Sequence, residues 1–551
     1  MSVQIQSLKK KISWSHPSVL PQGHWLTPWL VFIAISITNI LAVMSLWAVD
    51  LGGSSIAGAL LLGTTELSWV SLSYIVVSST CVPISDWFSN RYGYKRIFFI
   101  GVLLFVIGTV CSGFATGFWS MVLARSVAGL GSAGIFPNSI TLLVKVFDEK
   151  LKTLVVSLYV AMAFGVGTIL GLQFSGYLLE NVSWQSIFFI VIWFVPLILG
   201  FIFCFFSETE KKDLGKFDGW GVILYLAFIA SLVTWIADVK APWNTEGFSS
   251  LFSKGTLFIM ITSFVGFLIR ENRCKSPLID LSLFRLPAFL NGALALFLVA
   301  ICFFSTVSGF NDIFQSVLNY SKSQAGYYLM PIGIGVGLFG GLSSYLSTKF
   351  GARIVYISGM LFVIISCILN QRITIQSDHI QMGWILFLRG SGIGLALGPL
   401  TSLMLRDVSS AQLGQAAFMA TLFRQMGGSL GSLGLSLIKE LRKPFHLARY
   451  GEQMGQNSQN LANIGSKLDN YFVSRSGAIP AGGDFVSTSS GVNEASELSY
   501  RWLSTYGTAQ AEISATNDAF LIFGLALSLI TLCIVLLISK DLLYKRLFKK
   551  R

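Results

Sequence analysis

The chain has 551 residues, of which 53% are hydrophobic and 12% are charged. Soluble globular proteins carry about 25% charged residues, so this composition excludes a string of water-soluble domains. The formal net charge of +13 is typical of a nucleic-acid binder or of a membrane protein. Here the positive residues flank hydrophobic stretches, where such charges contact anionic lipid and fix topology. We therefore expect a membrane protein whose partners include lipid and exclude nucleic acid.

Fourteen hydrophobic stretches follow one another along the chain. Each approaches the length of about 20 apolar residues that crosses roughly 30 Å of hydrocarbon. The expected fold class is an all-α polytopic membrane protein. We expect spans at 27–49, 66–88, 97–116, 119–146, 153–179, 186–206, 219–237, 255–270, 288–311, 325–347, 353–369, 380–405, 413–437 and 516–539.

The distribution of positive charge predicts the orientation. With a cytoplasmic N-terminus, 25 of the 39 Lys and Arg residues are cytoplasmic, 11 are external and 3 lie inside the spans, when Lys145, Arg270 and Arg353 at the cytoplasmic ends of their spans are counted as cytoplasmic. Cytoplasmic loops of membrane proteins carry such an excess. An even number of spans returns the C-terminus to the cytoplasm, where the tail is basic. We expect a multi-pass protein of the cell inner (plasma) membrane with both termini in the cytoplasm.

Two cytoplasmic loops divide the spans into groups of six, two and six, and a third loop, long and external, lies within the last group. Two six-span halves are the plan of transporters that move around a site near the membrane midplane. Short basic turns with a central Gly, at 90–96 and 348–353, occupy corresponding places in the two halves and indicate an internal repeat; ordinary positive-inside turns would also explain them. The expected segments are a cytoplasmic N-terminal segment 1–26, a first half 27–206, a linker 207–218, two extra helices 219–270, a linker 271–287, a second half 288–539 with a long external loop 438–515, and a basic tail 540–551.

The cysteines and histidines predict no site chemistry. Six of the seven Cys residues fall in expected spans and Cys274 in a cytoplasmic loop, so a disulfide framework is not expected. The four His residues are scattered, without metal-ligand spacing. We expect no metal, no cofactor and no catalytic residues.

Several ordered motifs resemble those of the major facilitator superfamily, in particular its 14-helix drug:proton antiporter branch. The resemblance covers nearly the whole chain, and each motif is weak alone but specific in combination. The motifs are Trp69-Val70 with Tyr74, the loop 83–96, Arg125 with Gly129, Gly131 and Pro137, the linker 276–285, Gln315 with Tyr320, Ala325-Gly326 and Pro331, and the segment 424–431 followed by a long external loop.

The resemblance implies a major facilitator fold, two six-helix halves plus two extra helices. It also implies proton-linked efflux of drugs or amphipathic compounds. The substrate would then be a small molecule, the coupling ion a proton, and a periplasmic adaptor protein a further partner that could dock on the long external loop.

The signature loop after the second span departs from the family pattern. The family places a Gly and an acid where this chain has Asp86 and Asn90. The acid is displaced by four residues, one helical turn, and stays on about the same face. We hypothesise that Asp86 and Arg91 take over the charge relay of this conformational switch, whose other members are Gly93, Lys95 and Arg96. The alternative is a solvated acid at a helix end.

The motifs that carry proton coupling in the family differ more strongly in this chain. The acid of the family's first helix corresponds to Ser45, and the Asn five residues later corresponds to Asp50. Five residues turn a helix by about 140°, so Asp50 does not replace that acid on the same face. Ala128 and Gly171-Leu172 stand where the family has Gln and Gly-Pro. These departures place proton antiport in question.

Three arginines fall within expected spans. Arg125 lies mid-span, where a charge is expensive and usually faces a cavity or a partner. It could polarise a coupling carboxylate, meet an anionic substrate group, or tie helix 4 to helix 1 structurally. Arg389 and Arg424 lie closer to span ends, from where their side chains could snorkel to the interface.

Asp50 and Asp312 are the acids nearest to the external ends of spans. A proton-coupled carrier needs a titrating group on its pathway, and no other expected span has an acid near its centre. We therefore expect transport or coupling roles for Arg125, Asp50 and Asp312. Wet loop acids would be the alternative.

Small residues and aromatic residues predict packing and a pocket. Ala163, Gly167, Gly171 and Ser175 form a stripe at i, i+4 spacing that lets helices approach closely. A pocket in such a protein should be apolar and aromatic with few polar groups. The expected liners are Ser45, Trp47, Phe310, Asn311, Phe314, Gln315 and Arg424.

Together these features favour a secondary active transporter that works by alternating access. A dedicated importer or exporter of one metabolite, such as a siderophore, with altered or absent proton coupling, remains the alternative within transport. A membrane enzyme would need clustered His, Asp, Ser or Cys residues at one membrane face, and the sequence has none. A sensor without flux would need a sizeable soluble signalling domain.

Overall fold

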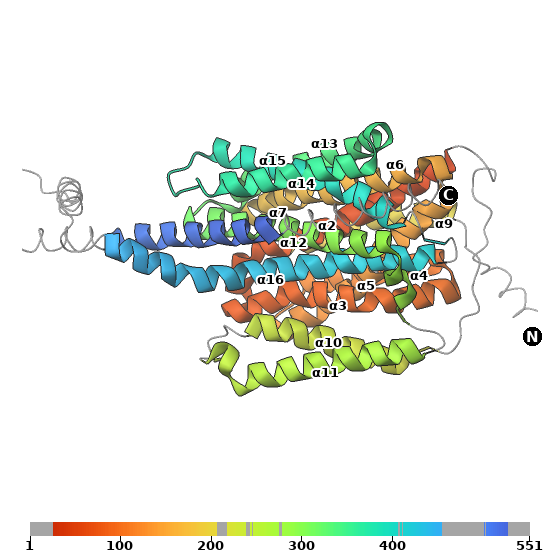
Figure 1. Cartoon of the computed structure of the whole chain (residues 1–551), viewed down its shortest axis with the longest axis horizontal. Coiled ribbons are helices and arrows are strands. Elements are labelled where there is room, and N and C mark those ends of the chain that lie inside the picture. The colour runs from red at the N-terminus through yellow and green to blue at the C-terminus, as the bar shows by residue number, and fades with distance from the viewer. Residues whose placement is uncertain are drawn as a thin grey trace, which may run out of the picture.

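The computed structural model of the chain is a bundle of long helices (Figure 1). It describes residues 26–206, 217–238, 243–244, 246–274, 278–405, 408–409, 412–453, 501 and 503–526. The described helices are α2 (Thr27–Leu60), α3 (Thr64–Tyr92), α4 (Tyr94–Gly113), α5 (Phe118–Val146), α6 (Glu149–Val160), α7 (Gly167–Asn181), α8 (Ser186–Phe189), α9 (Val191–Phe205), α10 (Gly219–Asp238), α11 (Leu251–Arg273), α12 (Pro287–Asp312), α13 (Lys322–Phe350), α14 (Ala352–Asn370), α15 (His379–Leu405) and α16 (Leu413–Gln453).

Shorter helical turns and one further helix complete the described chain. Residues 503–526 are helical. The 3-10 turns are η2 (Gly247–Ser249) and η3 (Leu281–Arg285), and the π-helical turns are η1 (Ala161–Val166) and η4 (Ile313–Val317).

The fold confirms the expected all-helical class. Within the described residues, twelve helical segments are long and apolar enough to cross a membrane, and no strand occurs. The expected thirteenth span lies within α16. The fourteenth, 516–539, lies only partly within the described residues, so the total of fourteen stays a prediction. The N-terminal segment, the linker 207–218, much of the loop 438–515 and the basic tail fall largely or wholly outside them.

Several helices are longer than expected. α2 continues to Leu60 rather than ending near residue 49, which puts Asp50 inside the helix. α16 reaches Gln453, beyond the end of the expected span at residue 437. It pairs with helical residues 503–526, and both project beyond the other helices (Figure 1).

Local chemistry explains where the helices begin. Pro28 occupies the first turn of α2, where its missing N–H is not needed. α13 begins with a capping box, in which Ser321 Oγ accepts from the Gln324 amide and the Gln324 side chain accepts from the Ser321 amide.

The two basic turns expected from the repeat are alike in structure. Gly93 joins α3 to α4 with φ 102°, and Gly351 joins α13 to α14 with φ 89°. Only glycine adopts such backbone angles readily. Eight residues beyond each turn, Gly101 and Gly359 lie against the backbones of Gly131 and Gly392. The repeated turn and the repeated close helix approach support an internal duplication.

We keep the division expected from the sequence and call α2–α9 the first half and α12 to residue 526 the second half. α10 and α11 pack against each other and lie beside α3, at the edge of the bundle (Figure 1). The first-half and second-half helices meet along a shared hydrophobic core. We call the bundle end that holds Asp50 the Asp50 end and the opposite end, with both glycine turns, the Gly93 end.

Candidate functional site

A central cavity lies where the two halves meet. Its lining comes from α2, α3, α5 and η1 of the first half and from α12 and α16 of the second. The lining residues are Ala42, Val43, Leu46, Tyr74, Ile75, Ser78, Phe136, Phe164, Phe304, Arg424 and Gln425. The cavity measures about 30 Å³, room for roughly two waters. It is therefore narrow in this conformation.

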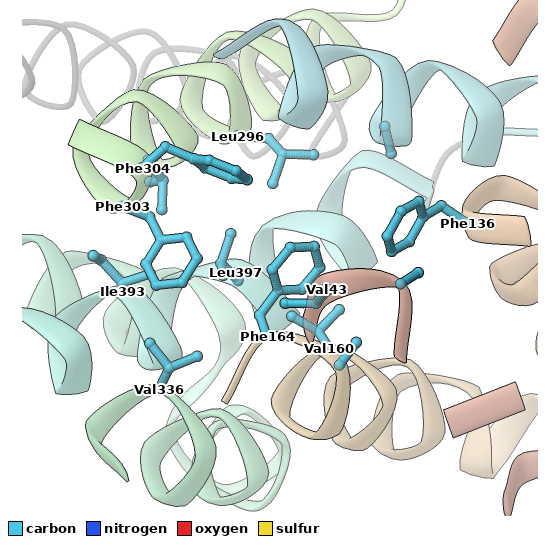
Figure 2. Close-up of a cluster of buried hydrophobic side chains, with 14 of the residues drawn as sticks. Val43, Phe136, Val160, Phe164, Leu296, Phe303, Phe304, Val336, Ile393 and Leu397 are labelled. Atoms are coloured by element: carbon cyan, nitrogen blue, oxygen red, sulfur yellow. The ribbon is translucent and has the colours of Figure 1, made fainter. Parts of the chain in front are cut away.

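The π-helical turn η1 positions an aromatic wall of the cavity. Such turns are rare and widen one turn of a helix, frequently at functional sites. η1 carries Phe164, which lies among apolar side chains of both halves (Figure 2). Phe164 lies 6.3 Å from Phe136 and 6.2 Å from Phe303, measured between ring centroids.

Arg424 places a guanidinium group in the cavity wall. Arg424 is only 2% exposed, and its Nε and Nη2 atoms have no hydrogen-bond partner among the described residues. The guanidinium carbon lies 4.6 Å from the Phe164 ring centroid. Beside it, Gln425 Nε2 donates to Ser78 Oγ at 2.8 Å and ties α16 to α3.

Arg125 lies on α5, outside the cavity lining. Its Nη1 donates to Ser45 Oγ on α2 at 3.1 Å, and its guanidinium lies 4.5 Å from the Tyr74 ring centroid. Arg125 therefore ties α5 to α2, and the position expected for the family's acid holds a serine that accepts from it.

Arg389 is wholly buried, and the expectation that Arg389 and Arg424 snorkel is wrong. Arg389 donates to Ser366 Oγ, to the Ser366 carbonyl, to Thr306 Oγ1 and to Asn370 Oδ1, at 3.0 to 3.3 Å. Its side chain is 0% exposed because polar groups of neighbouring helices surround it at bundle depth. Because neighbouring helices enclose Arg389, its side chain does not extend to the membrane surface.

Polar contacts join the two halves at the Asp50 end. Asn311 Nδ2 donates to the Asp50 carbonyl and Gln315 Nε2 to the Leu51 carbonyl, each at 3.1 Å. Lys322 donates to Ser55 Oγ, and the Ser323 amide donates to Glu180 at 3.0 Å. The structure thus brings the expected residues Asp50, Asn311 and Gln315 together, with Asp312 next to Asn311 in the chain.

An ion-pair network continues from Asp312 onto the paired ends of α16 and residues 503–526, which we call the projecting hairpin. Lys439 Nζ lies 2.8 Å from Asp312 and 3.0 Å from Glu512, and Lys443 lies 2.9 Å from Glu512. Partial burial would raise the pKa of Glu512, but the two lysines outweigh it and hold this pKa below its usual value. Arg442 and His446 likewise bind Asp518.

A hydrogen-bonded chain links the signature loop to the other half at the Gly93 end. Asn90 Nδ2 donates to Asp86 Oδ1 at 2.8 Å, and the Tyr94 hydroxyl donates to Asn90 Oδ1 at 3.0 Å. The Tyr94 hydroxyl lies directly against Gly414 of α16. Asp86 is buried, so it is not the solvated acid of the alternative, and its charge-relay role with Arg91 stays a prediction.

The basic residues of this loop occupy different environments. Lys95 is buried and its Nζ donates to the Phe206 carbonyl at 2.6 Å, at the end of α9. Arg91 lies 5.2 Å from the centroid of the Trp87 ring. Lys95 therefore fastens α4 to α9.

The small-residue stripe packs helices as expected. A Cβ on Gly171 would lie 3.0 Å from Met44 Cα, and one on Gly167 would lie 3.1 Å from Val43 Cβ, so α7 lies close against α2. Ser175 is also buried. Nearby, Gly165 of η1 lies against the backbone of Gly337, where the halves meet.

Of the expected pocket residues, Arg424 lines the central cavity. Ser45 binds Arg125, and Trp47 packs on Phe303 and Phe304 and donates to Thr168. Phe310 packs on Phe520, and Phe314 stacks on Tyr320. Sequence reasoning missed Phe164, Phe304 and Gln425 as liners. Tyr74 was missed as well. Tyr74 and Gln425 belonged to the quoted motifs, which could have indicated these two, whereas Phe164 and Phe304 belonged to none of them.

Within the described part of the chain, no group of three or more His, Cys, Asp or Glu side chains could hold a metal ion. The six described cysteines are free thiols. What the site offers is an aromatic cavity with a buried positive charge between two halves, the arrangement of a membrane transporter.

The sequence model of the Major Facilitator Superfamily matches residues 25–432, and the chain belongs to this family. It is accordingly a multi-pass membrane transporter of small molecules rather than an enzyme. The sequence resemblance to this family is thereby confirmed.

Relatives and solved structures agree with the family. Multidrug resistance protein Stp of Mycobacterium tuberculosis (strain CDC 1551 / Oshkosh) is 26% identical over 74% of this chain and 74% of its own length. Probable multidrug resistance protein EmrY of Escherichia coli (strain K12) is 23% identical over 85% of this chain and 90% of its own. The human organic anion transporter MFSD10 has a similar fold, with a TM-score of 0.54 at 13% identity over 91% of this chain and 99% of its own.

Proposed function

We propose that the chain exports drugs or other amphipathic compounds across the cell inner membrane by proton-linked alternating access. The single observation that carries this proposal is the aromatic cavity between the halves. An apolar and aromatic pocket with few polar groups suits amphipathic ligands. The multidrug resistance names of relatives at low identity support the same substrate class.

The contacts between the halves support alternating access. At the Asp50 end Asn311 and Gln315 bind carbonyls of α2. Toward the Gly93 end Gly340 lies against Ala161 of η1, and Gly398 lies against Ser157 of α6. The halves touch on both sides of the narrow cavity, so a substrate enters or leaves only when one set of contacts opens.

For the coupling group we propose Asp50, with Asp312 as its neighbour across the two halves. Asp50 is half-buried at the boundary between them, whereas Asp312 already pairs with Lys439. A carboxyl group that loses and regains water as the end opens and closes can bind and release a proton in each cycle. Arg125, which binds Ser45, is proposed to position α2 for this movement.

One observation favours the alternative of a dedicated importer or exporter of one metabolite, such as a siderophore, with altered or absent coupling. The first-helix position next to Arg125 holds Ser45, which cannot carry a proton as a carboxylate does. The direction of transport and its dependence on the proton gradient distinguish the two proposals.

The test measures accumulation of labelled lipophilic compounds and of iron-loaded and iron-free siderophores in cells that lack their major pumps. Cells with and without the chain are compared before and after collapse of the proton gradient. Lower accumulation, reversed by the collapse, supports proton-linked export. Higher accumulation of one compound supports the importer and refutes export.

Asp50→Asn tests the coupling group. We expect gradient-driven export to fall to background while substrate binding remains, because the amide keeps the shape but carries no titrating proton. Asp378→Asn, at an exposed acid near the start of α15, is the matched control and should transport normally. Normal export by Asp50→Asn would remove Asp50 from the mechanism.

The projecting hairpin of α16 and residues 503–526 is proposed as the place where a periplasmic adaptor would dock. Its support is geometric only, since both helices extend past the rest of the bundle (Figure 1). Co-purification of an adaptor with the full chain, lost when the hairpin tip is shortened, would test this proposal.

A further inference from the structure

We infer that the central cavity binds amphiphiles that bear an anionic group, a carboxylate or sulfonate, and that Arg424 is the residue that selects them. This inference rests on the proposed function and narrows its substrate class. Its starting observation is a guanidinium group in the cavity wall, 2% exposed, with Nε and Nη2 atoms that no described residue binds.

A buried guanidinium without a counter-charge is unfavourable, since removing a charge from water costs several kcal/mol unless it is paired. The described lining offers no such partner, because its polar members are Tyr74, Ser78, Arg424 and Gln425. Gln425 donates to Ser78, and the Tyr159 hydroxyl that interacts with Arg424 is neutral, so neither group offsets the guanidinium charge. The cavity therefore has a net positive charge and two free donors.

The same protein shows how it stabilises an arginine that has no ligand to meet. Arg389, equally buried, donates four hydrogen bonds to Ser366, Thr306 and Asn370. Arg424 lacks this surrounding set of acceptors although it lies at comparable burial. Arg125 also has Nε and Nη2 atoms without a partner, but it lies outside the cavity lining. Of the three arginines only Arg424 borders the cavity, where an acceptor from outside the chain can reach it.

The geometry of the free donors points to a planar or tetrahedral oxyanion. Arg presents its N–H groups as a rigid fork that matches carboxylate, sulfonate or phosphate oxygens. The rest of the lining is aromatic and aliphatic, with Phe164 stacked 4.6 Å from the guanidinium and Phe136 and Phe304 beyond it. An apolar ring system with one acidic group would pack on the aromatic lining and bind the guanidinium group.

The experiment measures equilibrium binding to the full chain in phosphatidylcholine nanodiscs. Two radiolabelled probes share a naphthyl ring and a four-carbon linker, and one ends in a carboxylate and the other in a trimethylammonium group. Empty nanodiscs correct for partition into lipid. We expect the carboxylate to bind the unmodified protein at least about tenfold more tightly than the ammonium probe, the effect of one charge-assisted hydrogen bond.

Arg424→Gln should weaken binding of the carboxylate about tenfold or more and leave the ammonium probe unchanged or bound more tightly. Arg424→Lys should fall between the two, since it keeps the charge but loses the fork. Arg372→Gln makes the same change at an exposed site and should match the unmodified protein. Equal affinity for both probes in the unmodified protein, which needs no variant, would overturn the inference.

Flux in proteoliposomes separates this inference from the proposed function. Transport of the ammonium probe but not of the carboxylate would overturn the inference and leave amphiphile export standing. Arg424-dependent binding of the carboxylate without gradient-driven flux would support the inference and overturn proton-linked export. Absence of both binding and flux for the two probes would overturn both.

Discussion

At the scale of residues, three buried arginines have three different environments. Arg389 is enclosed by hydrogen-bond acceptors, Arg125 binds one serine and faces an aromatic ring, and Arg424 borders the cavity with two free nitrogen atoms. In the sequence the three arginines are indistinguishable, because each is a charge within a hydrophobic span. Because Arg125 also has unpartnered Nε and Nη2 atoms, it is the place in the cavity lining that makes Arg424 the arginine available to a ligand.

We predict that Arg389→Gln destabilises the protein more than Arg424→Gln does. The first change deletes several hydrogen bonds to a charged donor, about 1.5–3 kcal/mol each before compensation. The second removes an unpaired charge and is expected to be neutral or stabilising. Thermal unfolding of both variants in one detergent, without substrate, gives the comparison. A lower Tm for Arg424→Gln than for Arg389→Gln would contradict it.

At the scale of elements, close helix contacts depend on glycine. Gly171 brings α7 against α2, and Gly108 of α4 lies against the backbone of Ala128 in α5. A side chain at these places would push two helices apart. The stripe read from the sequence therefore marks an actual contact surface.

We predict that Gly171→Leu lowers the folded yield and the Tm, because overpacking costs about 1–3 kcal/mol. Gly200→Leu is the matched control, since a Cβ at Gly200 meets nothing within 4 Å. Fluorescence-detected size-exclusion chromatography of both variants measures the monodisperse fraction. Equal behaviour of the two would show that the α2–α7 contact tolerates a large side chain.

The projecting hairpin should respond to acid. Because the pKa of Glu512 is held below its usual value, its pairing stabilises the hairpin above the ordinary glutamate pKa and is lost as pH falls through the lowered one. Spin labels at Leu447 and Ser504 would report the separation of the two helices. We predict a broader distance distribution at acid pH than at pH 7.

Glu512→Gln provides the control for this effect. It should broaden the distribution already at pH 7 and reduce the further change on acidification. An acid response of equal size in Glu512→Gln would assign the pH dependence to other groups, such as Asp518 with Arg442 and His446.

At the scale of the whole molecule, the halves contact each other on both sides of one small cavity. The contacts at the Asp50 end are polar, whereas those toward the Gly93 end include closely packed small residues such as Gly340 with Ala161. Alternating access requires each set to open in turn.

We predict that a cross-link on either side stops transport. Ser55→Cys with Lys322→Cys would join the halves at the Asp50 end, where these two side chains touch. Leu158→Cys with Gly341→Cys would join them on the other side, since a Cβ at Gly341 lies 3.8 Å from Leu158 Cδ2. In a background without native cysteines, flux should cease on oxidation and return on reduction. Full flux in a cross-linked protein would exclude opening at that side.

The sequence by itself determined the helical membrane fold, the family, the repeated glycine turns and the small-residue stripe. These depend on hydrophobic length, charge placement and local backbone preference, which residues close in the chain decide. Only the tertiary structure decided which arginine borders the cavity, that Asp50 and Asp312 lie together, and that Phe164 and Phe304 rather than Phe310 and Phe314 border the cavity. Those facts depend on contacts between residues more than a hundred positions apart, where a quarter turn of a helix moves a side chain from the cavity to the lipid.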